Sequence, residues 1–147
     1  MKVEKHSLLE QVWPYPFQTA VEKGYPSIFQ YLNYWVLIEP MDNLKVGYTG
    51  SLDMGHFHFV GNTYILPEFR KEGFHSFLLS ERNKRLPLKP KITILNPIEE
   101  SQMFHLVKVV TKLGYHPVNS YEDVRDIMSE KMYYLILNEK QQIWRMN

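Results

Sequence analysis

The segment NTYILPEFRKEGFHSFLLSERNKRL, residues 62–86, constrains the fold of this chain more than any other. Its strand-like start, residues 63–66, stops at Pro67, which cannot donate a backbone hydrogen bond to a sheet. A charged turn containing Gly73 follows, and an amphipathic helix begins near Phe74. The segment therefore predicts a strand, a tight charged turn and a helix in immediate succession.

Such a turn has two readings, a plain surface connection or a cradle for phosphate. Phosphate binds to unpaired backbone N–H groups and to the positive end of a helix dipole, and both occur at a helix N-terminus. Gly73 would let backbone approach a ligand closely, and Arg70 and Lys71 add positive charge. Taken alone, this pattern is more typical of a surface turn.

The bulk composition narrows the class of protein. A chain of 147 residues suggests one domain, residues 1–147. Its 44% apolar content is enough to form a hydrophobic core. The formal net charge of +1 argues against a dedicated nucleic-acid-binding protein. Cysteine is absent, which excludes disulfides, thiolate metal sites and a cysteine nucleophile. With a polar N-terminus and no apolar run of about 18 residues, we expect a cytoplasmic protein without a membrane span.

The remaining pattern predicts a mixed α/β sheet covered by helices. Expected strands are residues 2–6, 34–40, 45–53, 57–66, 91–95 and 132–138, with QIWRM pairing back onto the last of these. Expected helices are one or two short ones within 7–33, one over about 73–86, and one from Asn96 to Gly114. The last helix has a capping asparagine, a proline at its first position and a glycine stop.

The stretch LPEFRKEGFHSFLL resembles the acetyl-CoA-binding signature of the GNAT superfamily of N-acetyltransferases. In that signature a strand ends in a Pro-acidic-aromatic turn, and Arg/Gln-x-x-Gly-x-Gly/Ala leads into a helix. The matching positions here are Pro67, Glu68, Phe69, Arg70 and Gly73. The flanks are similar too, through Val46-Gly47 before the signature and KITILNP and KLGY after it, so the resemblance covers roughly residues 35–137.

The resemblance implies a GNAT-like α/β (α+β) fold, with a mixed, mostly antiparallel central sheet, a splayed strand pair and flanking helices. Pantetheine would lie where the strand through residues 65–66 leaves its neighbour near 92–96, and turn amides would hold the pyrophosphate. The implied acetyl-CoA-binding residues are Ile65, Leu66, Arg70, Lys71, Glu72, Gly73, Phe74, His75 and Asn96.

Three positions depart from the family pattern. His75 replaces the second small residue of the signature. Val110 stands where the family commonly has the tyrosine that protonates the departing thiolate. Asn96 lies about two helical turns further from the closing glycine than the family's usual asparagine.

Acetyl transfer to an amine needs a base, an oxyanion donor and a proton for the thiolate. The base candidates are His58, which should share a strand face with His56, and Glu39; each is also readable as an ordinary strand residue. Two histidines without a third ligand do not predict a metal site. A backbone N–H near Leu66 could stabilise the oxyanion. The candidate proton donor for the thiolate is Tyr115, with Tyr121 as the alternative, and both tyrosines can also be read as packing residues.

Two further groups of residues have both a functional and a structural reading. An aromatic-rich N-terminal third would wall the acceptor site or pack on the sheet: Trp13, Tyr15, Phe17, Tyr25, Phe29, Tyr31, Tyr34 and Trp35. A basic run would attract a phosphate or nucleic acid, or form a solvated helix end: Arg82, Lys84, Arg85, Lys89 and Lys91.

The prediction is an acetyl-CoA-dependent N-acetyltransferase that acts by direct attack of an amine, either a small molecule or a protein. The alternative is a GNAT-fold binding or interaction protein that has lost catalysis.

Overall fold

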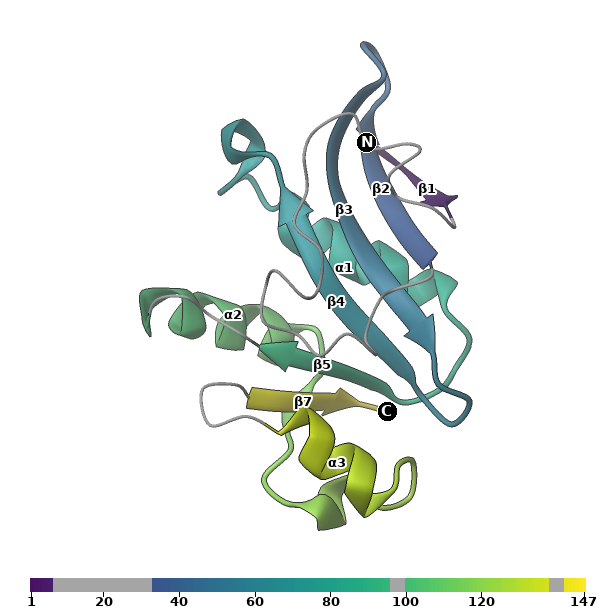
Figure 1. The fold of residues 1–147 in the computed structure, drawn as a ribbon. Helices are drawn as coiled ribbons and strands as arrows, with labels where there is room; N and C mark the ends of the chain where they lie inside the picture. The colour runs from purple at the N-terminus through teal and green to yellow at the C-terminus, as the bar shows by residue number, and fades with distance from the viewer. Residues whose placement is uncertain (7–32, 96–99, 138–141) are drawn as a thin grey trace. The chain divides into compact units, whose positions relative to one another are not determined.

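The computed structural model describes residues 1–6, 33–95, 100–137 and 142–147 (Figure 1). They form two compact units, Met1–Leu52 with Val60–Pro87, and Asp53–Phe59 with Leu88–Asn147. The predicted helices within 7–33 and the predicted cap Asn96 lie outside the described residues.

The predicted fold class is confirmed, because the sheet is mixed and mostly antiparallel. Its hydrogen-bonded order is β1-β2-β3-β4-β5-β7-β6, and β4 and β5 form a parallel pair. The strands are β1 (Lys2–His6), β2 (Asn33–Glu39), β3 (Leu44–Asp53), β4 (His58–Ile65), β5 (Lys91–Leu95), β6 (His116–Pro117) and β7 (Gln142–Met146). The described part also holds the helices α1 (Phe74–Arg85), α2 (Glu100–Lys112) and α3 (Glu130–Ile136).

In the first unit, β2 and β3 form a hairpin whose turn is closed by a side chain. The Glu39 carboxylate accepts hydrogen bonds from the backbone N–H groups of Met41 and Asp42, each at 2.8 Å. Asn43 completes the turn with φ 53°, a left-handed conformation that asparagine tolerates.

Helix α1 packs on one face of this sheet, as Figure 1 shows for the strands of the first unit. The buried side chains at this contact form one apolar cluster: Trp35, Leu37, Val46, Ile65 and Leu78. Phe69 and Phe74, on either side of the charged turn, pack against the same cluster. Burial of each large apolar side chain contributes about 1.5–3 kcal/mol, so the turn is held between two anchored ends.

Gly47 in β3 has a steric role. A Cβ at this position would lie 2.6 Å from the Tyr64 carbonyl oxygen and 2.5 Å from Ile65 Cδ1. The close approach of β3 to the end of β4 therefore requires glycine, which accounts for the Val-Gly pair in the sequence.

In the second unit, β5 pairs with β7 in antiparallel register, and α2 ends as predicted at Gly114. The Gly114 N–H donates to the Thr111 carbonyl, and the Tyr115 N–H donates to the Val110 carbonyl. With φ 100° at Gly114, these two bonds form a Schellman motif.

The prediction of a strand over 132–138 is wrong, because residues 132–136 belong to α3. The Ser129 hydroxyl accepts a hydrogen bond from the Met132 N–H and caps the helix. Tyr133 and Ile136 are buried at helical spacing, whereas Tyr134 and Leu135 are exposed. Strand β7 accordingly pairs with β5 and β6 and not with 132–138.

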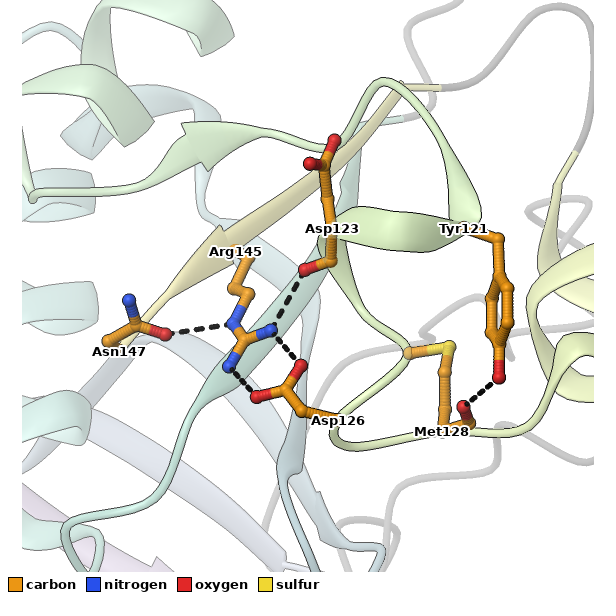
Figure 2. A network of polar contacts seen from close by, with 6 residues as sticks. All are labelled: Tyr121, Asp123, Asp126, Met128, Arg145 and Asn147. Atoms are coloured by element: carbon orange, nitrogen blue, oxygen red, sulfur yellow. Dashed lines mark hydrogen bonds and ion pairs between the residues drawn. The ribbon is translucent and has the colours of Figure 1, made fainter.

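Within the second unit, Arg145 of β7 holds the 121–128 loop against β7 (Figure 2). Its guanidinium makes two parallel bonds to the Asp126 carboxylate, at 2.6 and 2.7 Å, and donates to the Asp123 carbonyl at 2.8 Å. The guanidinium holds the pKa of Asp126 below its usual range. At the other end of the loop, the Tyr121 hydroxyl donates to the Met128 carbonyl at 3.0 Å.

We expect Arg145→Met to lower the free energy of unfolding by about 1–3 kcal/mol, because it removes a bidentate pair and leaves a carbonyl unpaired. Arg125→Met is the matched control. Its exposed ion pair with Glu122 should contribute about 0–1 kcal/mol. Urea denaturation of both variants checks the difference, and equal losses would show that the Arg145 contacts do not stabilise the loop.

Candidate functional site

The candidate site is the connection between β4 and α1. After Leu66, a short 3-10 turn runs over Pro67–Phe69, and the chain then passes through left-handed conformations at Lys71, φ 65°, and Gly73, φ 85°. Gly73 is the N-cap of α1, and it makes no side-chain capping hydrogen bond to the helix. Nothing lies within 4 Å of where a Cβ on Gly73 would stand, so its backbone borders open space.

Three consecutive backbone N–H groups in this turn have no hydrogen-bond acceptor among the described residues. Within the described chain, the N–H groups of Lys71, Glu72 and Gly73 make no hydrogen bond, and all three residues are exposed. They directly precede the N-terminus of α1. The turn therefore presents a set of donors next to the positive end of a helix dipole.

The charges at the turn have different roles. Arg70 folds back, with Nε donating to the Ile65 carbonyl at 2.8 Å and its guanidinium 5.3 Å from the centre of the Tyr64 ring. Lys71 is exposed, and the first turn of α1 carries no acidic residue. The first turn itself therefore does not offset the helix dipole, although the exposed carboxylates of Glu68 and Glu72 lie in the preceding turn.

The implied coenzyme residues of the first unit are therefore contiguous in space as well as in sequence. Ile65 and Leu66 are buried, and the Leu66 N–H donates to the Val46 carbonyl at 2.9 Å. That amide is engaged with β3, which leaves it no proton for an oxyanion in this conformation. Phe74 and His75, at the start of α1, are half-buried.

His58 belongs to the second unit, where it begins β4 and pairs with Lys91 of β5. Its side chain is 3% exposed, and neither ring nitrogen has a hydrogen-bond partner among the described residues. Burial lowers the pKa of His58; Lys89 and Lys91 lower it further, and Asp53 opposes them. The imidazole is consequently neutral at pH 7, the state that a base requires. His56 is exposed in the preceding turn, so the two histidines do not share a strand face.

The other catalytic candidates have structural partners. Hydrogen bonds from the Asp42 and Met41 amides hold the pKa of Glu39 below its usual range, which makes this carboxylate a weaker base. Tyr115 is buried directly after the Schellman motif of α2. Both His58 and Tyr115 lie in the second unit, whereas Glu39 and the turn lie in the first.

The basic run does not form one exposed surface. Arg82 and Lys91 are 2% and 3% exposed, and Arg82 donates to Thr49 Oγ1 at 2.8 Å beneath α1. The exposed Lys84 and Arg85 pair with Glu81, and the half-buried Lys89 pairs with Asp53. Of the five basic residues, only Lys84 and Arg85 fit the reading of a solvated helix end.

Sequence reasoning missed one polar cluster in the first unit, formed by Tyr34, Tyr48, Asn62 and Tyr64. The alternation of Asn62 and Tyr64 along β4 was a usable signal, because it places both side chains on one face.

In the described ranges, no group of three His, Asp or Glu residues could hold a metal ion. None of the described helices is long and apolar enough to cross a membrane.

Comparison with solved structures identifies the fold. A protein from Bacteroides thetaiotaomicron assigned to the GNAT family of acetyltransferases superposes with a TM-score of 0.58, at 12% identity, over 100% of this chain and 87% of that one. N-acetylglutamate synthase from Neisseria gonorrhoeae, solved with coenzyme A and N-acetyl-glutamate, gives 0.57 at 10% identity, over 99% of this chain and 35% of that one.

A third structure comes from Salmonella typhimurium, is assigned as an acetyltransferase and contains its cofactor acetyl-CoA. It gives a TM-score of 0.51 at 13% identity, over 78% of this chain and 64% of that one. No protein-family model matches the sequence, and no curated protein matches it. The strand order, the β4–α1 turn and these superpositions agree, and the chain has the fold of the GNAT superfamily of acetyltransferases.

Proposed function

We propose that this protein is an N-acetyltransferase that moves an acetyl group from acetyl-CoA to an amine. The observation that carries the proposal is the row of acceptor-less N–H groups at Lys71, Glu72 and Gly73, at the start of α1. Its support is the fold, since structures with the same fold contain acetyl-CoA or coenzyme A.

The residues of the turn fit a pyrophosphate. Three amides in a row with two left-handed residues form a concave set of donors, which suits phosphate oxygens. Gly73 leaves room for close approach, and Lys71 supplies a mobile positive charge. His75 is bulkier than the family's small residue; it is the second residue of α1 and is half-buried.

In the proposed reaction the amine nitrogen attacks the thioester carbon, the carbon–sulfur bond breaks, and coenzyme A leaves with the electron pair. The proton that the nitrogen loses goes to His58, to Glu39 or to water; His58 is neutral, but both of its ring nitrogens are buried and would have to become accessible. The thiolate receives its proton from Tyr115, from Tyr121 or from water, because Val110 has no donor. The acetylated amine and coenzyme A are the products.

We expect Gly73→Val to weaken acetyl-CoA binding by roughly tenfold or more, because it places a branched side chain where backbone donors face the phosphates. Isothermal titration calorimetry measures the affinity. Gly55→Val is the matched control: Gly55 also has positive φ, 90°, with nothing within 4 Å of its Cβ position. The two variants should share the backbone strain, and only Gly73→Val should lose affinity.

The unmodified protein separates this proposal from its rival. Absence of acetyl-CoA binding at millimolar ligand would rule out the proposed site. Binding without thiol release across a broad amine panel would instead favour a GNAT-fold binding protein without catalysis.

A further inference from the structure

Arg70, at the start of the candidate coenzyme turn, is exposed, yet its guanidinium is held at two points. Nε donates to the Ile65 carbonyl at 2.8 Å, and Cζ lies 5.3 Å from the centre of the Tyr64 ring. A long exposed side chain ordinarily keeps its rotamer freedom, because ordering it costs entropy. Two contacts on one exposed guanidinium therefore give it a defined orientation.

The carbonyl that Arg70 binds is one that β3 cannot pair. The Leu66 N–H donates to the Val46 carbonyl of β3 at 2.9 Å. Backbone groups of successive strand residues point to opposite edges of a strand, so the preceding carbonyl, that of Ile65, points away from β3. Arg70 thus ties the turn to the last residue of β4.

The ring that Arg70 contacts is itself fixed by the core. Tyr64 is half-buried and stacks on Tyr48, with ring centres 5.8 Å apart and 29° between the ring planes. Tyr48 is fully buried and meets Tyr34 edge to face at 5.9 Å. A series of contacts therefore runs from the buried ring of Tyr48, through Tyr64, to the guanidinium at the surface.

These contacts leave part of the guanidinium unused. Its N–H donors lie in one plane, and their fork matches the oxygens of a phosphate. The Nη groups of Arg70 have no hydrogen-bond partner among the described residues, and the exposed Glu68 and Glu72 form no ion pair with them. These donors belong to the residue that directly precedes the three unpaired amides at 71–73.

We propose that Tyr64 is a positioning residue of the coenzyme site, whose ring holds the Arg70 guanidinium so that its Nη groups meet the phosphates of the coenzyme. The inference rests on the proposed acetyl-CoA site and assigns to it a residue outside the turn. Tyr64 acts through Arg70 and does not itself contact a phosphate. A guanidinium already held in one orientation loses less entropy on binding an anion than a free one.

A double-mutant cycle in acetyl-CoA affinity tests this role. Tyr64→Leu removes the ring, and binding should weaken by about two- to fivefold, the range of one exposed cation–ring contact. Arg70→Gln removes the cation and should weaken binding by about tenfold or more. Adding Tyr64→Leu to Arg70→Gln should then have no further effect. Isothermal titration calorimetry gives the four affinities, and an equal effect of Tyr64→Leu in both backgrounds would overturn the inference.

Two further variants show whether the ring and its place are responsible. Tyr64→Phe should restore the affinity that Tyr64→Leu loses, because a phenyl ring keeps the face that Arg70 contacts. Lys5→Met is the matched control, since it removes the cation from another cation–ring pair of the first unit, Lys5 over Trp35 at 5.6 Å. Its affinity should not change. A loss in Tyr64→Phe or in Lys5→Met as large as that in Tyr64→Leu would contradict a role of this ring.

A measurement without coenzyme separates this inference from the transferase proposal. In ¹⁵N-labelled protein, the Arg70 Nε–H should exchange slowly with water because it is hydrogen-bonded, and Tyr64→Leu should accelerate this exchange several-fold. Exchange that Tyr64→Leu leaves unchanged would overturn the positioning role even in a protein that binds acetyl-CoA.

Inorganic pyrophosphate is the probe for a protein that fails to bind acetyl-CoA. A shift of the Arg70 Nε resonance on its addition, at lower concentration in the unmodified protein than in Tyr64→Leu, would keep the positioning role and reject the transferase. The absence of a shift in such a protein would reject both.

Discussion

Gly47→Ala is expected to lower the free energy of unfolding by about 3 kcal/mol, more than a typical surface substitution in this chain. The added Cβ would stand 2.6 Å from the Tyr64 carbonyl oxygen, which is backbone and cannot rotate away. Relief requires β3 to move from the end of β4. That movement would lengthen the 2.9 Å hydrogen bond from the Leu66 N–H to the Val46 carbonyl.

A double-mutant cycle distinguishes the two contacts of the new methyl group. The second contact, at 2.5 Å, is to Ile65 Cδ1, the flexible end of a side chain. Ile65→Val removes that atom, so the double variant should recover only part of the loss, and the remainder measures the backbone clash. Urea denaturation gives each value. A Gly47→Ala protein as stable as the original would show that β3 and β4 are not held at this distance.

Strand ends and helix starts were predictable where a residue acts through its own backbone. Pro67 ends β4 because it lacks an N–H, and Gly73 precedes α1 because it takes a positive φ. Gly114 ends α2 for the same reason. These effects are local, so the sequence reveals them without knowledge of the surroundings.

The strand predicted over 132–138 shows how a local signal can mislead. Its tyrosines and isoleucine have high strand propensity, but burial of Tyr133 and Ile136 on one side selects a helix. Ser129 was the available helix signal, because its hydroxyl caps α3. Propensity differences are a few tenths of a kcal/mol per residue, whereas burial of one large side chain contributes about 1.5–3 kcal/mol.

The candidate site was predictable only in part. The conformation of some of its residues depends on the local sequence, whereas the burial of others depends on distant elements. The turn at 67–73 is encoded by consecutive residues, so it was identified directly. The burial of Arg82, His58 and Asn62 depends on other elements packing over them. A sequence pattern records residue types along one element, and it carries no information on which partner a buried polar atom finds.

His58→Gln is expected to lower turnover by roughly 10²-fold if His58 is the proposed base, while acetyl-CoA affinity stays the same. Glutamine retains much of the volume and the polarity but cannot take a proton. His56→Gln is the matched control, two residues earlier and exposed, and its turnover should not change. Equal turnover in the two variants would assign proton removal to another group or to water.

The pH dependence of stability provides a second readout of the same residue. Burial holds the folded-state pKa of His58 below its ordinary value of 6.5, so the unfolded chain binds the proton more readily. The contribution of neutral His58 to stability is therefore complete above pH 6.5 and is lost as the pH falls through that value. Protonation would place a buried charge beside Lys89 and Lys91, and among the described residues Asp53 offsets them.

Together these two readouts decide whether burial of His58 serves catalysis. In the unmodified protein, turnover at saturating amine should fall only at a pH below 6.5, because burial holds the pKa of the base below that value. In His58→Gln, the loss of stability at acid pH should become smaller. The residual turnover should no longer depend on the ionisation of the side chain at position 58. A smaller stability slope with unchanged turnover would make His58 a buried core residue, and it would leave the proposed transferase to operate through water.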